Sequence, residues 1–513
     1  MRKKLRSEGK NIMKPLSEEV LRDKIRGCYL GKNVGGTLGA PFEGEKEMND
    51  VGFYTQKLDG NPLPNDDLDL QLLWLVMAEY YGLEHLTSRH FGEYWLNAVT
   101  GPWGEYAHCR WNCLEGFFPP LSGSCENDFF RYSNGAWIRS EIWACLCAGR
   151  PDDAIRFAWL DSSCDHSGDG IYAEMFTAAL EAAAFYCSDL QELLKIALSK
   201  IPAGRLRESI ELTIAGHAAG KDWKTVRNEI VAHNTDIGMF QAAVDVPFTV
   251  LALLYGEGDF GKTVCLAVNC GDDTDCTAAT AGSVLGIIQG AKALPGKWID
   301  PIGDGIATIS LNRFGMPLPI PKTVTELTLR IQRLRKIAEL YDPRSVLPVE
   351  DFFAPEIAQE LWQRSPYELL FDLLFTTVSV DFPDGPYAEP GKPVKLKIGI
   401  RDGILEPGVV RMRWLLPEGW TCAAPELSFG ARIYYRIELE TTVTPPETTL
   451  PAMSYLHLKV TTAERGCPSV ITVPVRSRTA VSFPAPDADP ARVGWSHKQG
   501  ILRSFNVIQK QQL

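Results

Sequence analysis

Three aspartates stand close together at the start of the stretch CGDDTDCTAATAGSVLGIIQG, as Asp272, Asp273 and Asp275. Carboxylates are favoured at a helix N-terminus, but one capping residue is enough, and crowded carboxylates repel one another unless a cation lies among them. Oxygen ligands without a pattern of histidines or thiolates favour hard cations such as Mg²⁺ or Mn²⁺. The stretch therefore predicts metal-assisted chemistry, with a solvated acidic helix start as the alternative.

Two other segments offer carboxylates at predicted helix ends. Asp66 and Asp67 follow Asn65, a good N-cap residue, and precede a helix that is apolar nearly all round. That helix must be buried, so its first carboxylates open onto an internal site, although ordinary capping explains them as well. Glu43 stands in a loop just beyond Pro41, where a first long helix is expected to stop. A single loop glutamate is usually solvated, so Glu43 gains weight only from the other acids.

Small residues recur every four positions in the two helices that must carry these acids, and on a helix such spacing makes one smooth stripe. The two stripes are Gly31, Gly35 and Gly39, and then Ala278, Gly282, Gly286 and Gly290. Smooth stripes let two helix backbones approach closely. We expect the two helices to touch, to gather the separate acids in one pocket, and to form a two-metal site with an activated water.

A polar insert, DSSCDHSGDG at 161–170, interrupts two apolar helices. His166 within it is either a capping or core histidine or a catalytic one. Residues 101–133 are rich in Trp, Gly, Pro and Cys without periodicity, and they predict a long loop of the kind that often forms a lid. Its aromatic residues either line a pocket or form a satellite core; they are Trp103, Tyr106, Trp111, Phe117 and Phe118.

Charge and cysteine usage exclude several classes. The net charge of −12 argues against nucleic acid as a partner. No run of 18 apolar residues exists, so no membrane span is expected, and the basic start MRKKLRSEGKNIMK lacks the apolar stretch of a secretory signal. The thirteen cysteines are scattered without a CxxC pair, so no zinc site is predicted. This usage of cysteine predicts a protein of the reducing cytoplasm.

At 513 residues the chain predicts two or three domains. We expect a basic arm at 1–16, a large all-α domain at 17–345 and a linker or bridging helix at 346–373, which includes most of PYELLFDLLF. Alternating segments near ten residues apart then predict an immunoglobulin-like antiparallel β-sandwich at 374–482, followed by an arm at 483–513. The sandwich carries no cluster of chemical residues, so it is interpreted as a scaffold, a carbohydrate contact or a homo-oligomer interface.

Five motifs stand in the same order as in the ADP-ribosylglycohydrolases, the dinitrogenase-reductase-activating and ADP-ribosylhydrolase group, which the chain resembles over roughly residues 17–310. They are GKNVGGTLGAPFEG, PNDDLDLQLLW, SNGAWIR, DHSGDGIYAEMF and CGDDTDCTAATAGSVLGI. The resemblance implies an all-α fold, two Mg²⁺ or Mn²⁺ ions, and hydrolysis of an N- or O-glycosidic bond to ADP-ribose in a protein or a small molecule.

The resemblance also assigns residues by position. It implies Asp67 and Glu43 as catalytic carboxylates. The implied metal ligands are Asn65, Asp66, Asp67, Asp273, Asp275 and Cys276. The implied contacts of ADP-ribose are His166, Gly168 and Gly170, with Asn134, Gly135 and Arg139 near the substrate pocket.

The sequence departs from the family pattern at two implied ligands. Asn65 replaces a hydroxyl residue, although an amide carbonyl still ligates a hard ion. Cys276 replaces a threonine, and a thiol is a poor partner for Mg²⁺. Two rival functions stay open: a metal- or ligand-binding relative without turnover, and a hydrolase of another glycosyl compound.

Overall fold

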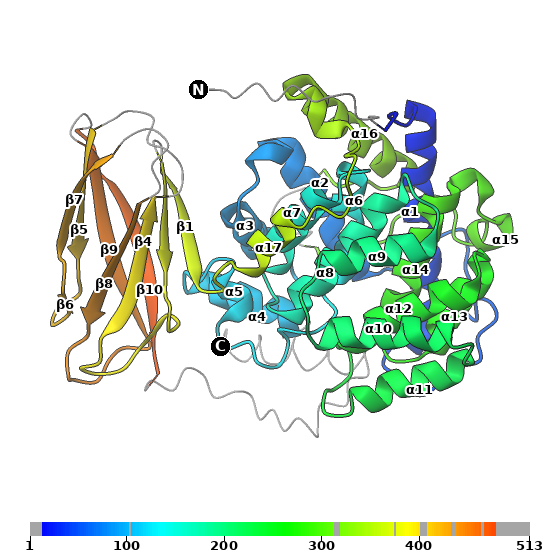
Figure 1. Ribbon diagram of the computed structural model, residues 1–513, viewed down its shortest axis with the longest axis horizontal. Helices are drawn as coiled ribbons and strands as arrows, with labels where there is room; N and C mark the ends of the chain where they lie inside the picture. Colours follow the sequence, from blue (N-terminus) through cyan, green and yellow to red (C-terminus); the bar gives the residue numbers. More distant parts are fainter. Residues whose placement is uncertain are drawn as a thin grey trace.

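The chain forms a large helical region followed by a β-rich region (Figure 1), which confirms the predicted division into helices and then strands. The structure is a computed structural model that describes residues 13–101, 104–311, 319–373, 376–400, 408–431, 437–462 and 466–478. Most of both predicted arms therefore lies outside the described residues, and the domain boundaries stay predictions. Among the helices described, none combines the length and the apolarity needed to cross a membrane.

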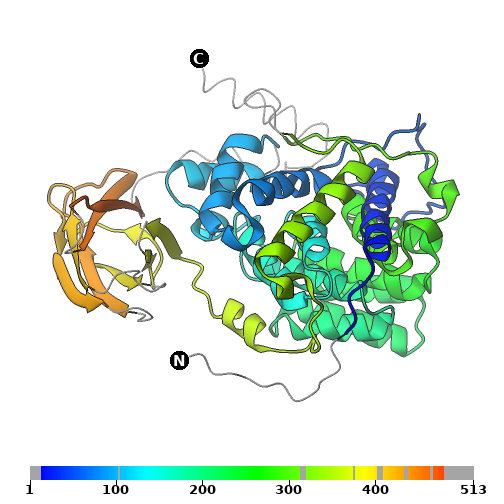
Figure 2. The same ribbon diagram turned by 90° about the horizontal axis from the view of Figure 1, so that it is seen from above.

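The helices differ widely in length, and the long ones form the body of the helical region (Figures 1 and 2). They are α1 (Glu18–Gly39), α2 (Asp66–Tyr81), α3 (Ser88–Ala98), α4 (Gly104–Leu114), α5 (Leu121–Ser124), α6 (Glu141–Leu146), α7 (Pro151–Ser162), α8 (Asp169–Ala184), α9 (Leu190–Ser199), α10 (Arg205–Ala218), α11 (Trp223–His233), α12 (Ala242–Gly256), α13 (Phe260–Asn269), α14 (Thr274–Gln289), α15 (Gly296–Ile299), α16 (Val324–Tyr341) and α17 (Glu356–Trp362). Short 3₁₀ turns follow α1 at Ala40–Phe42 and precede α6 at Trp137–Arg139.

The predicted contact between the two glycine stripes is confirmed and forms the centre of the helical region. A methyl group at Gly31 would overlap the carbonyl oxygen of Gly282, and one at Gly282 would overlap the carbonyl of Gly31. The same holds for Gly27 against Gly286, one turn further along. Gly290 ends α14 as its C-cap with φ +80°, and it also lies against α1, because a methyl group at Gly27 would be 2.9 Å from its carbonyl carbon. The backbones of α1 and α14 therefore touch with no side chain between them.

Helix α2 is buried along most of its length, as its apolar sequence predicts. Leu70, Leu73 and Trp74 have no exposed surface, and they belong to one hydrophobic cluster that includes residues of α1, α8 and α14. The N-cap is also the predicted one, because the Asn65 side chain accepts a hydrogen bond from the backbone N–H of Asp67. The start of α2 is therefore fixed against the stripe helices.

The long loop predicted at 101–133 is wrong, because much of the segment is helical as α4 and α5. Its aromatic residues serve different purposes. Tyr106 is buried in the helical core, Phe117 is buried against the β-rich region, and Trp111 is exposed. Trp103 lies outside the described residues.

The β-rich region contains, in the part that the structure describes, two five-stranded sheets with the orders β1-β2-β4-β8-β6 and β3-β10-β9-β5-β7. The strands are β1 (Glu368–Leu373), β2 (Thr376–Asp381), β3 (Tyr387–Ala388), β4 (Val394–Ile400), β5 (Gly408–Leu415), β6 (Thr421–Cys422), β7 (Glu426–Ala431), β8 (Ile437–Thr444), β9 (Met453–Thr462) and β10 (Ser469–Ser477). Neighbouring strands pair antiparallel except for β10 with β3. The immunoglobulin-like topology stays a prediction.

One element of the predicted linker is corrected. The apolar segment PYELLFDLLF, expected in a linker or bridging helix, contains strand β1, in which Leu369 pairs with Val380 of β2. Short apolar runs do not distinguish a strand from a buried helix, so periodicity alone could not settle this segment.

We predict that Gly31→Ala lowers the stability of the protein by at least about 1–3 kcal/mol, the usual cost of forcing extra atoms into a packed core. The new methyl group would push α1 away from α14, because the obstacle is backbone and cannot rotate aside. The melting temperature measures the loss. Gly238→Ala is the matched control, since a methyl group there meets nothing within 4 Å. Equal melting temperatures for the two variants would contradict the close contact.

Candidate metal-binding active site

The separate acids predicted from the sequence lie together at the N-terminal ends of α2 and α14. One ligand atom from each of Asp67, Asp275 and Cys276 lies within 4.8 Å of the others, and the same is true of Glu43, Asp273 and Asp275. Asp275 belongs to both groups, so the two groups are continuous. The close packing of α1 against α14 brings Glu43, just beyond the end of α1, to the first turn of α14.

The short loop that carries Glu43 is tied to the start of α14 by the backbone. Gly44 N–H donates to the carbonyl of Asp272 at 2.9 Å, and Asp272 N–H donates to the carbonyl of Glu45 at 2.8 Å. Asp272 itself has φ +65°, and its carboxylate accepts from the N–H of Phe240. Asp272 therefore shapes the turn, and Asp273 and Asp275 are left to face the site.

Three carboxylate oxygens in this cluster are buried and have no hydrogen-bond partner: Asp67 Oδ2, Asp273 Oδ1 and Asp275 Oδ1. Burial, reinforced by Asp275, raises the pKa of Asp67 well above its usual value, even though Lys32 works in the opposite direction. Burial and the neighbouring carboxylates also raise the pKa of Asp273. Buried acceptors without partners are costly, and a hard divalent cation would satisfy them. The donor set therefore fits Mg²⁺ or Mn²⁺.

The two residues that depart from the family pattern face the carboxylates with hydrogen-bond donors. Asn65 uses Oδ1 to cap α2, and its Nδ2 donates to Asp275 Oδ2 at 3.2 Å. The Cys276 thiol donates to Asp67 Oδ1 at 3.3 Å. Asn65 therefore presents an amide N–H rather than a free carbonyl to Asp275, and its role as a metal ligand stays a prediction.

Asp66 stands at the outer edge of the site, where Tyr106 O–H donates to Asp66 Oδ2 at 3.2 Å. Glu105, next to Tyr106 on α4, also lies near this edge, and burial raises the pKa of its carboxyl while His166 lowers it. Glu105 is not among the residues predicted from the sequence, because its segment was expected to form a loop.

A buried lysine lies behind the carboxylates. Lys32 of α1 is 2% exposed, and its ammonium donates to Glu141 Oε1 and to the carbonyl of Ile138, both at 2.7 Å. It stands 4.0 Å from Asp67 Oδ2. Although burial acts against the charge, Glu141 and Asp67 raise the pKa of Lys32. Lys32 is not among the residues predicted from the sequence, where its signal is a charged residue directly after Gly31 of the glycine stripe.

The predicted residue Asn134 lies directly on the acidic cluster. Its Nδ2 donates to Asp273 Oδ2 at 2.7 Å and to Asp245 Oδ2 at 2.6 Å, while its Oδ1 accepts from Trp137 Nε1 at 2.9 Å. Asn134 therefore orients Asp273. Asp245 of α12 is a further buried carboxylate that sequence reasoning missed, since it lies in an apolar helix far from any recognised motif.

Arg139 is fully buried in a different cluster. Its guanidinium donates to Asp161 Oδ1 at 2.8 Å, to Asp165 Oδ1 at 2.6 Å and to the carbonyl of Gly135 at 2.5 Å. Burial works against it, yet Arg139 and His166 lower the pKa of Asp165 to about 2. Through these hydrogen bonds, Arg139 fixes Asp161 and Asp165 of the polar insert.

His166 is held on both sides. Its Nδ1 lies 2.9 Å from Asp165 Oδ1, and its Nε2 lies 3.0 Å from the hydroxyl of Ser133. Gly168, with φ +53°, stands at the start of α8, and a methyl group at Gly170 would lie 2.5 Å from the carbonyl of Arg131. The insert therefore requires small residues at both glycines.

The fold and the site define a class: an all-α region with a buried carboxylate cluster at helix ends, suited to a hard cation, next to a polar loop at the start of a helix. The sequence pattern of the ADP-ribosylglycohydrolases matches residues 17–328, and the chain belongs to that family. ADP-ribosylarginine hydrolase Tri1 of Pseudomonas putida is 24% identical over 306 residues, 56% of this chain and 76% of that protein. An uncharacterised protein of Archaeoglobus fulgidus is 25% identical over 305 residues, 55% of this chain and 93% of that protein.

We predict that Asp273→Asn raises the stability of chelator-treated protein and reduces the stabilisation by Mn²⁺. The substitution removes one of several repelling carboxylates whose unpaired oxygen costs about 1–3 kcal/mol when buried. It also removes an oxygen ligand for a cation. Melting temperatures with a chelator and with Mn²⁺ measure both effects. Asp50→Asn, at an exposed position, is the control. A gain with Mn²⁺ equal to that of the wild type would show that Asp273 holds no cation.

Proposed function

We propose that the protein is a metal-dependent hydrolase that cleaves a glycosidic bond to ADP-ribose in an ADP-ribosylated protein or small molecule. The observation that carries this proposal is the set of unpartnered, buried oxygens of Asp67, Asp273 and Asp275 beside Glu43. Membership in the ADP-ribosylglycohydrolase family supports the bond class. The proposed cofactor is Mg²⁺ or Mn²⁺, with two ions expected from the resemblance.

The proposed ligands are the residues predicted from the sequence: Asn65, Asp66, Asp67, Asp273, Asp275 and Cys276. A bound divalent cation supplies Lewis-acid stabilisation and activates a water. Asn134 holds Asp273 in place, and Lys32 supplies a fixed positive charge behind Asp67.

The proposed reaction is the addition of water across the glycosidic bond. Glu43 or Asp67 accepts a proton from the attacking water as its oxygen forms a bond to the anomeric carbon of ribose. The bond from that carbon to the nitrogen or oxygen of the substrate breaks, and the leaving group takes up the proton that the carboxylate returns, so that one water is consumed overall. The negative charge of the carboxylates at the site stabilises the positive charge that develops on the ribose.

Recognition of ADP-ribose is assigned to the polar insert. His166, Gly168 and Gly170 form a tight turn into α8, whose N-terminal N–H groups attract the negative charge of a pyrophosphate. The distant relative Tri1 is named as an ADP-ribosylarginine hydrolase. An arginine linkage is therefore the first substrate to test.

One observation favours a second candidate, a binding protein without turnover. The Asn65 amide and the Cys276 thiol both donate to carboxylates that a cation needs. In that case cations or ADP-ribose would bind, but no bond would be cleaved.

We predict that the wild-type protein with Mn²⁺ releases ADP-ribose from an ADP-ribosylarginine peptide, and that Asp67→Asn and Glu43→Gln slow the release by about 10²–10⁴-fold, the usual contribution of a general base. Asp50→Asn should leave the rate unchanged. Release is measured by chromatography of the products.

The substrate panel should include a serine-linked peptide, small ADP-ribosyl compounds and other glycosides. Absence of release from all of them, with Mn²⁺ binding seen by calorimetry, would favour the binding protein. Cleavage of a non-ADP-ribosyl glycoside alone, lost in Asp67→Asn, would assign a different glycosyl substrate.

A further inference from the structure

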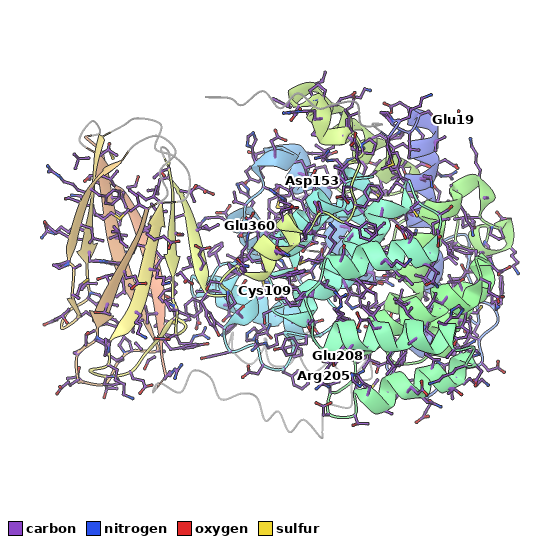
Figure 3. All side chains as sticks on the ribbon, viewed as in Figure 1. Glu19, Cys109, Asp153, Arg205, Glu208 and Glu360 are labelled. Carbon is purple, nitrogen blue, oxygen red and sulfur yellow. The ribbon has the colours of Figure 1, made fainter. Side chains whose placement is uncertain are left out.

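The β-rich region begins at Glu368, beyond the family match, which ends at residue 328. It contacts the helical region at the segment formed by α4 and α5, which lies next to the sheets in Figures 1 and 2. Cys109 of α4, labelled in Figure 3, marks this side of the helical region. Phe117, Leu121 and Cys125 are buried in the same hydrophobic cluster as the strands, so the sheets and this segment share a core.

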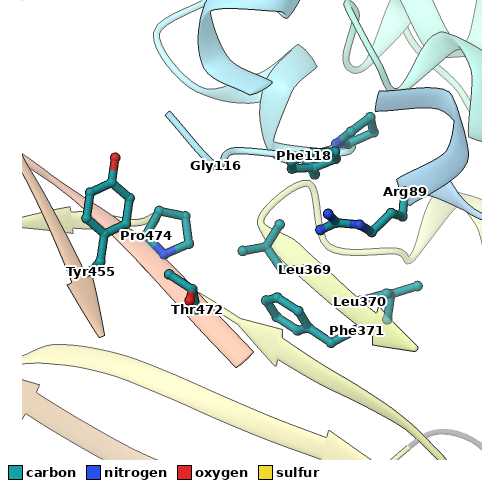
Figure 4. Close-up of a pocket in the computed structure, with 10 residues that line it drawn as sticks. Arg89, Gly116, Phe118, Leu369, Leu370, Phe371, Tyr455, Thr472 and Pro474 are labelled. Carbon is teal, nitrogen blue, oxygen red and sulfur yellow. The ribbon is translucent and has the colours of Figure 1, made fainter. Parts of the chain in front are cut away.

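The apolar part of this junction is not packed throughout. A cavity of about 130 Å³ lies between Arg89 of α3, the turn at Gly116–Phe118, and residues Leu369 of β1 and Pro474 of β10 (Figure 4). Polar contacts also join the sheets to the helices at this junction.

A single arginine supplies several of these polar contacts. Arg476 of β10 is 3% exposed, and its guanidinium lies 4.7 Å from the ring centre of Phe117. It forms ion pairs with Glu115 and, at 2.7 Å, with Glu126. Its Nη2 also donates to Asn112 Oδ1 at 3.0 Å. Arg476 therefore contacts Asn112 near the end of α4 and Glu126, two residues beyond the end of α5, at the same time.

Asn112 connects Arg476 to the helical region. Its side chain is 1% exposed, and its Nδ2 donates to the carbonyls of Ser122 at 2.9 Å and Cys125 at 3.0 Å. The Asn112 side chain therefore joins Arg476, which donates to its oxygen, to the backbone of the α5 segment, which accepts from its nitrogen.

The α5 segment in turn holds the backbone of the polar insert. Ser122 Oγ donates to the carbonyl of Cys164 at 2.6 Å, and Asn127 Nδ2 donates to the carbonyl of Asp165 at 2.7 Å. Gly123 lies directly against the backbone of His166, where a methyl group would be 2.7 Å from the amide nitrogen. Ser122 and Asn127 are both buried.

We propose that Arg476 is a positioning residue for substrate binding, and that the β-rich region serves the hydrolase by fixing the loop of His166 through Asn112 and α5. The proposal rests on the proposed function, in which that loop contacts ADP-ribose. Each link is a hydrogen bond between buried groups, and buried groups that lose a partner must rearrange. Loss of Arg476 therefore loosens the loop without touching the carboxylate cluster.

The first test is hydrogen–deuterium exchange on the full chain. In Arg476→Met, exchange of amides in peptides covering 161–172 should become roughly two- to thirtyfold faster, the usual range for a substitution along a coupled network. Peptides covering α10 should not change. Arg478→Met is the matched control, because Arg478 is exposed and lies over Tyr387 within the β-rich region. Identical exchange of 161–172 in the two variants would overturn the proposal.

The second variant, Asn112→Ser, interrupts the same path from the helical side and should give the same faster exchange. If Arg476→Met fails to fold, Asn112→Ser alone tests the proposal. Unchanged exchange of peptides covering 161–172 in Asn112→Ser would also overturn it. In the double variant the effects should not add, since both residues act through one path. Additive effects would mean that Arg476 acts on the loop by another route.

Kinetics give an independent readout. On the substrate that the wild type cleaves, Arg476→Met should raise KM by roughly two- to thirtyfold with kcat within about twofold, because the loop binds substrate and the carboxylates are intact. A fall in kcat with unchanged KM would contradict a positioning role in binding. If the wild type cleaves no ADP-ribosyl substrate, the proposed function fails, while the exchange measurements still decide whether Arg476 holds the loop.

Discussion

The contact between the backbones of α1 and α14 is the constraint on which the site depends. Glycine faces glycine where Gly27 meets Gly286 and where Gly31 meets Gly282, so no side chain separates the two helix backbones at these points. The loop of Glu43 and the first turn of α14 then meet at one end of this contact. Glycines inside helices cost up to about 1 kcal/mol each. Their presence in both helices is explained by this geometry rather than by helix stability.

Two buried charge clusters lie next to each other and differ in how their charges are balanced. Around Arg139, the guanidinium is paired with Asp161 and Asp165, although both carboxylate oxygens of the neighbouring Glu174 are buried without a hydrogen-bond partner. Around Asp273 and Asp275, buried oxygens stay unpartnered, and Lys32 is already committed to Glu141. Unsatisfied buried carboxylates are expected where a ligand completes the structure. What distinguishes the Asp273 cluster is that its unpartnered oxygens come from carboxylates that lie within 4.8 Å of one another, as a shared cation requires.

The features that could be predicted from the sequence are those that depend on residues close together in the chain. The four-residue recurrence of glycine, the capping position of Asn65 and the acids at helix starts are all visible along the chain. Lys32, Glu105 and Asp245 were missed because their importance comes from neighbours distant in sequence. The helix α4 was missed because its residues show no clear apolar periodicity, and its burial is shared between the helical core and the sheets. Strand β1 was missed because a short apolar run fits a strand and a buried helix equally well.

The placement of the polar insert explains why a β-rich region can matter to a site formed by helices. The insert lies between α7 and α8, and two of its backbone carbonyls are satisfied by the side chains of Ser122 and Asn127 from another segment. Arg139 fixes the insert through the side chain of Asp165, whereas the α5 segment holds the backbone of the insert. The position of the insert therefore depends on the residues that hold Ser122 and Asn127 in place. In this protein that support extends through Asn112 to Arg476, so the strands form part of the structure that shapes the proposed substrate loop.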